Sequence, residues 1–241
     1  LVNVKGAKNL CDAAERCHVE TIIFTSSVAI YGFAPEGTDE TGQANYFNDY
    51  GRTKYLAENI YIDWYNKDPE NRNLIIIRPT VIFGEDNRGN VYNLFKQIAT
   101  KKFIMIGDGK NIKSMAYVDN VAEFIKFSLS FKKNLHIYNY IDKPDLDMNS
   151  LVKMTRKILF GKNNVGLRLP SFLGIFIGKL ADYVSILIRK KIPISSIRVE
   201  KFMKTTSFNS SIKKTGFVAP ISMEDALKKT IRHEFLKNKL Q

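Results

Sequence analysis

The chain has 241 residues, and its 37 lysines and arginines against 24 aspartates and glutamates give a formal net charge of +13. Apolar residues make up 44% of the sequence, which supports a buried core and excludes an intrinsically disordered protein. No uncharged apolar run reaches the ~18 residues expected of a membrane-spanning helix. Two explanations of the positive net charge are equally good: it keeps the protein soluble, or it attracts a polyanionic partner such as a diphosphate or an anionic lipid.

The first predicted element is a helix over residues 1–19, which begins with no methionine and no capping residue in front of it. We therefore expect the sequence to start inside an element of a longer protein. Cys11 and Cys17 lie on different faces of this helix, so a disulfide between them is not expected. Such cysteine usage is typical of a reducing compartment and predicts a cytoplasmic protein.

Two apolar strands and a second helix follow. Residues 19–27 ("VETIIFTSS") and 73–84 ("NLIIIRPTVIFG") are β-branched and aromatic runs that predict buried strands. Residues 49–66 repeat apolar side chains at helical spacing. Fully apolar strands separated by helices indicate an α/β fold whose parallel sheet is covered on both faces.

Shorter elements of alternating type complete the chain. Helices are predicted at 91–102, 117–130 and 147–160, and strands at 103–111 and 134–142. No internal repeat or low-complexity linker separates them. We expect residues 1–84 to belong to the main sheet domain and residues 85–241 to form mainly a small α/β annex, with 114–142 returning to the main sheet.

Tyr50 and Lys54 are the first candidates for chemistry. They stand four residues apart in "NDYGRTKYLAE" and so share one face of the predicted helix. Taken alone, the pair is explained more readily by a packed tyrosine and a solvated lysine. Ser26 and Ser27 shift that balance, because they end a strand at its carboxyl edge, where parallel α/β sheets place their ligands.

Five segments, in this order, resemble the extended short-chain dehydrogenase/reductase family of NAD-dependent sugar epimerases and dehydratases. The segments are "NVKGAKNL", "TSSVAIYG", "YGRTK", "IRPTVIFG" and "MAYVDNVA". The resemblance covers nearly the whole chain. It implies a Rossmann-like sheet that binds NAD, whose first strands are missing from this sequence, with a small substrate-binding annex.

The resemblance also implies a role for each matching residue. Tyr50 takes the proton from a sugar hydroxyl while hydride leaves the same carbon, and Ser27 hydrogen-bonds that oxygen. Lys54 favours the phenolate, because a free tyrosine loses its proton only near pH ~10 and a nearby cation makes that loss easier. Asn3 completes the catalytic set. The expected cofactor contacts are Tyr50, Lys54, Pro79 and Ser26.

The glycine-rich turn that holds the NAD diphosphate in this family is not present in the sequence. Each βαβ unit takes about 30 residues, so about 90 residues are expected upstream. The segment "GDGKN" is no substitute, since no predicted helix follows it to present backbone N–H groups to a phosphate. The sequence therefore predicts the catalytic half of the site and lacks most of the dinucleotide half.

The residues after Ser27 bear on the type of reaction. Related dehydratases carry an Asp-Glu pair there, whereas this chain has Val28 and Ala29. Neither side chain moves a proton, which favours 4-epimerisation, by C4 oxidation and hydride return, over dehydration. Residues 76–99 and 138–149, in particular, resemble 4-epimerases of undecaprenyl-diphospho-linked N-acetylglucosamine. A soluble UDP-sugar epimerase or reductase remains an alternative, and so does a non-catalytic NAD-binding scaffold, although the intact catalytic set argues against the scaffold.

Lys113 stands where soluble UDP-sugar epimerases commonly carry an arginine that grips the diphosphate. A lysine cannot make the bidentate fork of an arginine, which counts against a UDP-sugar. Asn90 and Arg198 are further candidate contacts of the sugar or diphosphate, although solvated surface charge explains Lys113 and Arg198 about as well. No nucleic-acid partner is expected. No metal site is predicted, because three histidines lack motif partners: His18, His136 and His233.

Two surfaces are predicted to make contacts beyond the substrate. In the family, the helices over 1–19 and 49–66 commonly pair into a homodimer, and an exposed Trp64 would suit that contact. The stretch "PSFLGIFIGKLADYVSILIRKK" predicts a helix over 171–189 with a narrow polar stripe and a wide apolar side. It is either a core helix or an interfacial helix on the inner face of the cytoplasmic membrane. In the second case the basic side chains after it reach anionic headgroups: Arg189, Lys190 and Lys191.

Overall fold

The computed structural model describes residues 2–188 and 195–236, apart from the side chain of Ile186. The chain divides into two compact units. The first unit comprises Leu1–Ile82, Ser114–Lys143 and Ser207–Met223, and the second comprises Phe83–Lys113, Pro144–Thr206 and Glu224–Gln241.

A parallel three-stranded sheet forms the centre of the first unit. Its order is β1-β2-β6, with β1 at Thr21–Thr25, β2 at Asn73–Pro79 and β6 at Leu135–Tyr140. Thr21 pairs with Asn73 in β2, and Leu74 pairs with Leu135 in β6. The predicted parallel α/β sheet is therefore confirmed.

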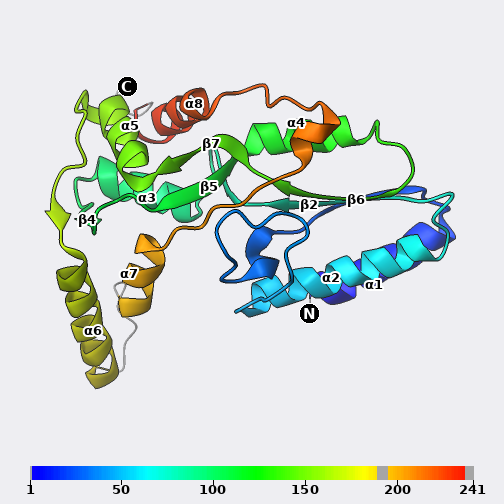
Figure 1. Ribbon diagram of the computed structural model, residues 1–241, viewed down its shortest axis with the longest axis horizontal. Coiled ribbons are helices and arrows are strands. Elements are labelled where there is room, and N and C mark those ends of the chain that lie inside the picture. Colours follow the sequence, from blue (N-terminus) through cyan, green and yellow to red (C-terminus); the bar gives the residue numbers. More distant parts are fainter. Residues whose placement is uncertain (1, 189–194, 237–241) are drawn as a thin grey trace. The chain divides into compact units, whose positions relative to one another are not determined.

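Alternating residues of β2 pack on opposite faces of this sheet, because successive side chains of a strand point to opposite sides. Leu74 and Ile76 pack against α1 (Val2–Arg16) and α2 (Asp49–Asn66). Ile75 and Ile77 pack against the other layer, which contains α4 (Val118–Ser128). Figure 1 shows α1 and α2 side by side on one face and α4 on the other.

The packing of α1 against α2 overturns one premise of the dimer prediction. Trp64 is only 2% exposed and lies in the core between these helices and the sheet, together with Tyr61 and Cys11. An aromatic residue buried within its own chain is not available to a partner chain. Cys11 and Cys17 are both free thiols.

The predicted strand over residues 73–84 is interrupted in the structure. β2 ends at Pro79, and a separate strand, β3 (Val81–Phe83), joins a second sheet of order β3-β5-β7. Proline has no backbone N–H to donate, which suits the end of a ladder. β5 covers Ile112–Tyr117, and β7 covers Asp142–Asp147, where no strand is predicted.

The second unit is mainly helical. It contains α3 (Asn90–Ala99), α5 (Met148–Phe160), α6 (Ser171–Leu187) and α7 (Ser196–Met203), with the short parallel strands β4 (Met105–Ile106) and β8 (Arg168–Leu169). The last helix, α8, covers Met223–Phe235. The sequence did not predict α7 or α8. Within the described parts of the chain, no helix is long and apolar enough to cross a membrane.

Candidate active site

The side chain of Lys54 connects α2 with the carboxyl end of β1. Lys54 Nζ donates a hydrogen bond of 2.8 Å to the carbonyl oxygen of Thr25, the last residue of that strand. The ammonium lies 5.0 Å from the centre of the Phe24 ring and 6.0 Å from that of Tyr50. Burial lowers the pKa of Lys54, while the Glu58 carboxylate opposes that shift. The helix therefore presents a cation and a phenol together at the strand end.

Ser27 begins the 3-10 turn η1 (Val28–Tyr31) that follows β1. Its Oγ accepts a hydrogen bond of 3.1 Å from the backbone N–H of Ala29. A serine hydroxyl has one donor and two acceptor positions, so this cap leaves the O–H free to donate to another oxygen. The local fold thus orients the hydroxyl without using its proton.

A glycine brings α2 close to this turn. Asn48 caps α2 by accepting the N–H of Gly51 at 2.8 Å. A Cβ on Gly51 would lie 2.4 Å from the carbonyl oxygen of Ala29, so only glycine permits this approach. Tyr50, beside that glycine, is 52% exposed. The first turn of α2 and the Ser27 turn are consequently parts of one site.

Asn3 joins the site from α1. Its Nδ2 donates a hydrogen bond of 3.0 Å to Thr53 Oγ1, on α2 between Tyr50 and Lys54. Thr53 Oγ1 in turn donates to the carbonyl oxygen of Tyr50 at 3.1 Å. The structure therefore brings the four predicted catalytic residues, Asn3, Ser27, Tyr50 and Lys54, to neighbouring turns of one unit, with Asn3 hydrogen-bonded to α2 at Thr53.

Ser26 and Pro79, the predicted cofactor contacts, lie at the ends of adjacent strands. Both are buried, and the Oγ atom of Ser26 has no hydrogen-bond partner among the described residues. Unpaired buried hydroxyls are uncommon in proteins. The orphaned hydroxyl, the Lys54 ammonium and the Tyr50 phenol at one strand end fit the ribose and amide groups of a nicotinamide nucleotide.

A buried polar cluster, which the sequence analysis missed, lies behind the site. Arg78 bonds to both carboxylate oxygens of Glu58, and its Nη1 donates to Tyr31 Oη at 2.7 Å. Tyr31 Oη donates in turn to Asn139 Oδ1 at 2.9 Å. Glu58 stands four residues after Lys54, a spacing that could have indicated its place on the same face of α2.

The loop between η1 and α2 is anchored by Glu40. Glu40 Oε1 accepts hydrogen bonds from the backbone N–H of Asn139 at 2.8 Å and of Ser211 at 3.0 Å. Thr38 also pairs with Phe208 in an isolated bridge. The loop that follows Ser27 is thus tied to β6 and to the segment over 207–211.

Three of the four predicted substrate contacts, all except Ser27, belong to the second unit. Asn90 is exposed at the first position of α3, and Arg198 is exposed in the first turn of α7. Lys113 Nζ donates to the carbonyl oxygens of Lys201, at 3.1 Å, and of Lys204, at the carboxyl end of α7. Burial lowers the pKa of Lys113 to about 8. Its ammonium therefore already has protein acceptors.

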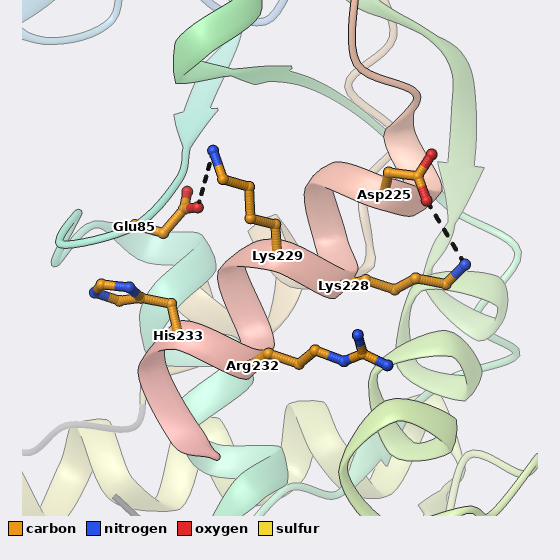
Figure 2. A pocket seen from close by; sticks show the side chains of 6 residues that line it. All are labelled: Glu85, Asp225, Lys228, Lys229, Arg232 and His233. Carbon is orange, nitrogen blue, oxygen red and sulfur yellow. Dashed lines mark ion pairs between the residues drawn. The ribbon is translucent and has the colours of Figure 1, made fainter. Parts of the chain in front are cut away.

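The second unit also has a hollow of about 470 Å³ along α8. Figure 2 shows its charged lining, in which Lys229 pairs with Glu85 at 3.4 Å and Lys228 with Asp225 at 3.7 Å. None of the predicted site residues lines it. We therefore assign the candidate active site to the first unit.

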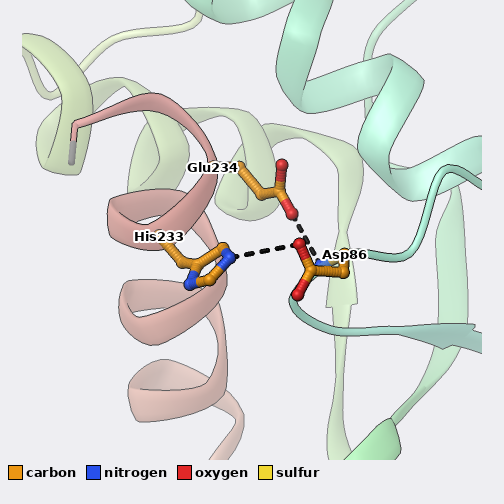
Figure 3. Close-up of side chains that lie close together, drawn as sticks. All are labelled: Asp86, His233 and Glu234. Carbon is orange, nitrogen blue, oxygen red and sulfur yellow. Dashed lines mark hydrogen bonds and ion pairs between the residues drawn. The ribbon is translucent and has the colours of Figure 1, made fainter. Parts of the chain in front are cut away.

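His233 also lies near two carboxylates, as Figure 3 shows. Its Nε2 is 3.3 Å from Asp86 Oδ1, and Asp86 N donates to Glu234 Oε1 at 2.7 Å. Arg88 bonds to the other oxygen of Glu234. Hydrogen bonds within the protein explain why His233, Asp86 and Glu234 lie together, because both Glu234 oxygens already accept such bonds.

Known proteins resemble the chain along its whole length. An N-acetyl-alpha-D-glucosaminyl-diphospho-ditrans,octacis-undecaprenol 4-epimerase from Escherichia coli O157:H7 is 48% identical over 237 residues, which is 98% of this chain and 71% of the relative. The structure of a UDP-glucuronic acid 4-epimerase from Bacillus cereus in complex with NAD superposes with a TM-score of 0.73 at 19% identity, over 99% of this chain and 68% of that one.

A UDP-glucose 4-epimerase from Thermotoga maritima with UDP-glucose gives a TM-score of 0.70 at 19% identity, over 99% of this chain and 70% of that one. At such identities the two solved structures support the fold alone. The profile of the NAD dependent epimerase/dehydratase family matches residues 1–140, which include every residue of the candidate active site. The chain therefore belongs to the NAD-dependent epimerase/dehydratase family.

Proposed function

We propose that the chain carries the catalytic residues of a 4-epimerase that interconverts N-acetylglucosamine and N-acetylgalactosamine linked through a diphosphate to a polyprenol. The observation that carries this proposal is the group of Ser27, Tyr50 and Lys54 at one strand end, in a chain 48% identical to an epimerase named for that substrate. The proposal includes the role of each residue, the identity of the sugar and the identity of the lipid carrier.

NAD is the proposed cofactor, held by Lys54, Ser26, Tyr50 and Pro79. When bound, it supplies a group that accepts a hydride from a sugar carbon and gives it back. The orphaned Ser26 hydroxyl supports this assignment, because a ribose or amide group would satisfy it.

Tyr50 is the proposed acid–base group of this chain. Its phenolic oxygen takes the proton of the sugar C4 hydroxyl as that carbon is oxidised, and returns it after the keto-sugar has turned over in the site. The Lys54 ammonium lies 6.0 Å from the centre of the Tyr50 ring, so its positive charge attracts the negative charge that develops on the phenolic oxygen during this transfer.

Ser27 is proposed to donate a hydrogen bond to the same sugar oxygen. Its Oγ already accepts from Ala29 N, and the hydroxyl proton remains available for donation to the sugar oxygen. Val28 and Ala29, which follow it, carry no titratable group. The site therefore favours epimerisation over the removal of water.

The outer parts of the substrate are proposed to meet the second unit through Asn90, Lys113 and Arg198. We further propose a homodimer formed through α1 and α2, whose exposed apolar side chains include Val2 and Leu10 of α1. A polyprenol tail stays in the bilayer, so the protein is proposed to work at the cytoplasmic face of the membrane.

The decisive assay incubates the purified protein with NAD and undecaprenyl-diphospho-N-acetylglucosamine and separates the released sugars. We expect N-acetylgalactosamine to appear until an equilibrium mixture is reached, with no net consumption of NAD. Turnover of UDP-N-acetylglucosamine without the lipid would favour the soluble UDP-sugar epimerase. Net conversion of NAD to NADH would favour a reductase running in its oxidative direction, and inactivity with binding of NAD would favour a scaffold.

A further inference from the structure

α6 turns its small and polar side chains towards the protein. A Cβ on Gly174 would lie 2.4 Å from Ile106 Cγ2, and one on Gly178 would lie 2.7 Å from Ser196 Cα. One turn further on, Asp182 Oδ2 accepts hydrogen bonds from Ser196 N at 3.1 Å and Ser196 Oγ at 2.6 Å. These residues recur every four positions, so the inner face of α6 is a stripe of glycines and a carboxylate.

The opposite face of α6 carries large apolar side chains that the protein leaves uncovered. They recur at intervals of three or four residues, as one helix face requires. Between 54% and 72% of each is exposed: Phe172, Phe176, Leu180, Tyr183 and Leu187. A surface helix ordinarily buries its apolar stripe and exposes its polar one. α6 does the reverse, so the interpretation of it as a core helix is not supported.

Exposed apolar residues on this scale mark a contact with a protein or a membrane. We propose that the outer face of α6 docks on the surface of an anionic lipid bilayer, with the helix lying in the interface. This inference rests on the proposed function, because it supplies a reason for the enzyme to stay where the polyprenol tail of its substrate is held.

The charges of α6 and of α7, which packs beside it in Figure 1, favour lipid over a second copy of the chain. Lys179 is exposed at the edge of the apolar stripe. α7 and the residue after it add the exposed Arg198, Lys201 and Lys204, against one exposed acid, Glu200. Each basic side chain close to an anionic surface strengthens binding about five-fold, whereas two copies would bring like charges together.

The dimensions of α6 also suit a helix that lies on a bilayer. It has 17 residues, which makes it roughly 25 Å long, and Lys179 and Asp182 interrupt its apolar sequence. Aromatic side chains such as Phe172, Phe176 and Tyr183 are favoured at the boundary between headgroups and acyl chains. The predicted contacts of Arg189, Lys190 and Lys191 lie outside the described residues, and the proposal does not depend on them.

Flotation of the full chain with vesicles tests the docking surface. The vesicles are phosphatidylethanolamine with phosphatidylglycerol as the minor component, and the test variant is Phe172→Ser/Phe176→Ser/Leu180→Ser. We expect the wild type to float at low salt and the variant to bind at least about 100-fold more weakly, since each lost apolar contact is worth about ten-fold. A control triple variant removes exposed apolar side chains outside α6 and should float like the wild type: Leu129→Ser/Leu167→Ser/Val218→Ser.

Two outcomes would overturn the docking surface directly. One is a wild type that stays in the soluble fraction at low salt, and the other is an α6 variant that floats as the wild type does. A change of sedimentation from dimer to monomer caused by the α6 substitutions without lipid would assign the face to a second copy, and would also overturn the inference.

Measurements of turnover distinguish a failure of the docking surface from a failure of the proposed function. The α6 variant should lose activity on undecaprenyl-diphospho-N-acetylglucosamine in vesicles. It should keep wild-type activity on geranyl-diphospho-N-acetylglucosamine, an analogue with a short lipid chain that stays in water. A wild type that floats but converts neither substrate would contradict the proposed function and leave the docking surface standing. A wild type that converts both substrates but never floats would contradict the docking surface and leave the proposed function standing.

Discussion

Glu58 and Arg78 are joined by two parallel hydrogen bonds inside the first unit. Arg78 Nε donates to Glu58 Oε1 at 3.0 Å, and Arg78 Nη2 donates to Glu58 Oε2 at 2.7 Å. Glu58 lies one turn after Lys54 on α2, and Arg78 is the last residue of β2 before Pro79. The ion pair therefore fixes the position of α2 along the sheet, and with it the position of Lys54.

Glu58→Ala should lower the free energy of unfolding by about 3–5 kcal/mol, because it leaves the buried Arg78 guanidinium without its counterion. Urea denaturation of the wild type and the variant measures the difference. Glu20→Ala is the control, since it breaks an ion pair with Lys133 whose two side chains are largely exposed, and a much smaller loss is expected there. Equal losses in the two variants would contradict the structural role of the buried pair.

Tyr50→Phe should reduce epimerase turnover by at least about 100-fold, because it removes the proposed acid–base oxygen. The exposed ring stays in place, so the free energy of unfolding should change by less than about 0.5 kcal/mol. Tyr46→Phe removes a phenolic oxygen four residues earlier and should leave turnover unchanged. Near-normal turnover by Tyr50→Phe would remove Tyr50 from the mechanism.

Gly51→Ala should destabilise the protein by about 1–3 kcal/mol, because the new methyl group meets the carbonyl oxygen of Ala29. It should also lower kcat more than it raises KM, since the first turn of α2 carries Tyr50 and must move away from Ser27. The measurements are thermal unfolding and steady-state kinetics.

Gly6→Ala is the matched control for that variant. A Cβ on Gly6 would have no neighbour within 4 Å, so the protein should gain roughly 0.5–1 kcal/mol from better helix propensity. A Gly51→Ala variant that is also stabilised would show that α2 does not need its close approach to the Ser27 turn.

Lys113 should make stability rise with pH between about 8 and 10.5. Burial lowers its pKa to about 8 in the folded protein from an ordinary value of 10.5. In that window the unfolded chain binds the proton and the folded chain does not, so unfolding takes up a proton and becomes less favourable as pH rises. Urea denaturation across the window measures the slope. Lys113→Met should have a flatter profile, and parallel profiles would contradict the lowered pKa.

The sequence predicted the parts of the fold that depend on local pattern. The apolar runs around Ile22 and Ile76 have only one stable environment, a sheet covered on both faces, and the structure has it. The separate strand β3 and the strand over Asp142–Asp147 were not predicted, because the partners of those strands are distant in sequence. The Glu58–Arg78 pair was missed for the same reason, since its 20-residue separation leaves no periodic signal.

The orientation of α6 could not be predicted from its apolar pattern. Its inward positions, Gly174 and Gly178, contribute almost nothing to a hydrophobic stripe, yet they allow the closest approach to Ile106 and Ser196. A hydropathy pattern gives no signal for close packing at a glycine, because glycine has no side chain. The pattern alone consequently left the core and interfacial interpretations open.

The anchor of the active-site loop has a consequence for the newly made chain. Glu40 accepts the N–H of Ser211, a contact that spans 171 residues. Closing so long a loop costs entropy that shorter contacts do not, so it forms late in folding. On the ribosome, β1, α2 and β2 are complete long before residue 211 emerges. The nascent protein therefore builds its sheet first, and the loop beside Ser27 takes its working shape only after residue 211 has been synthesised.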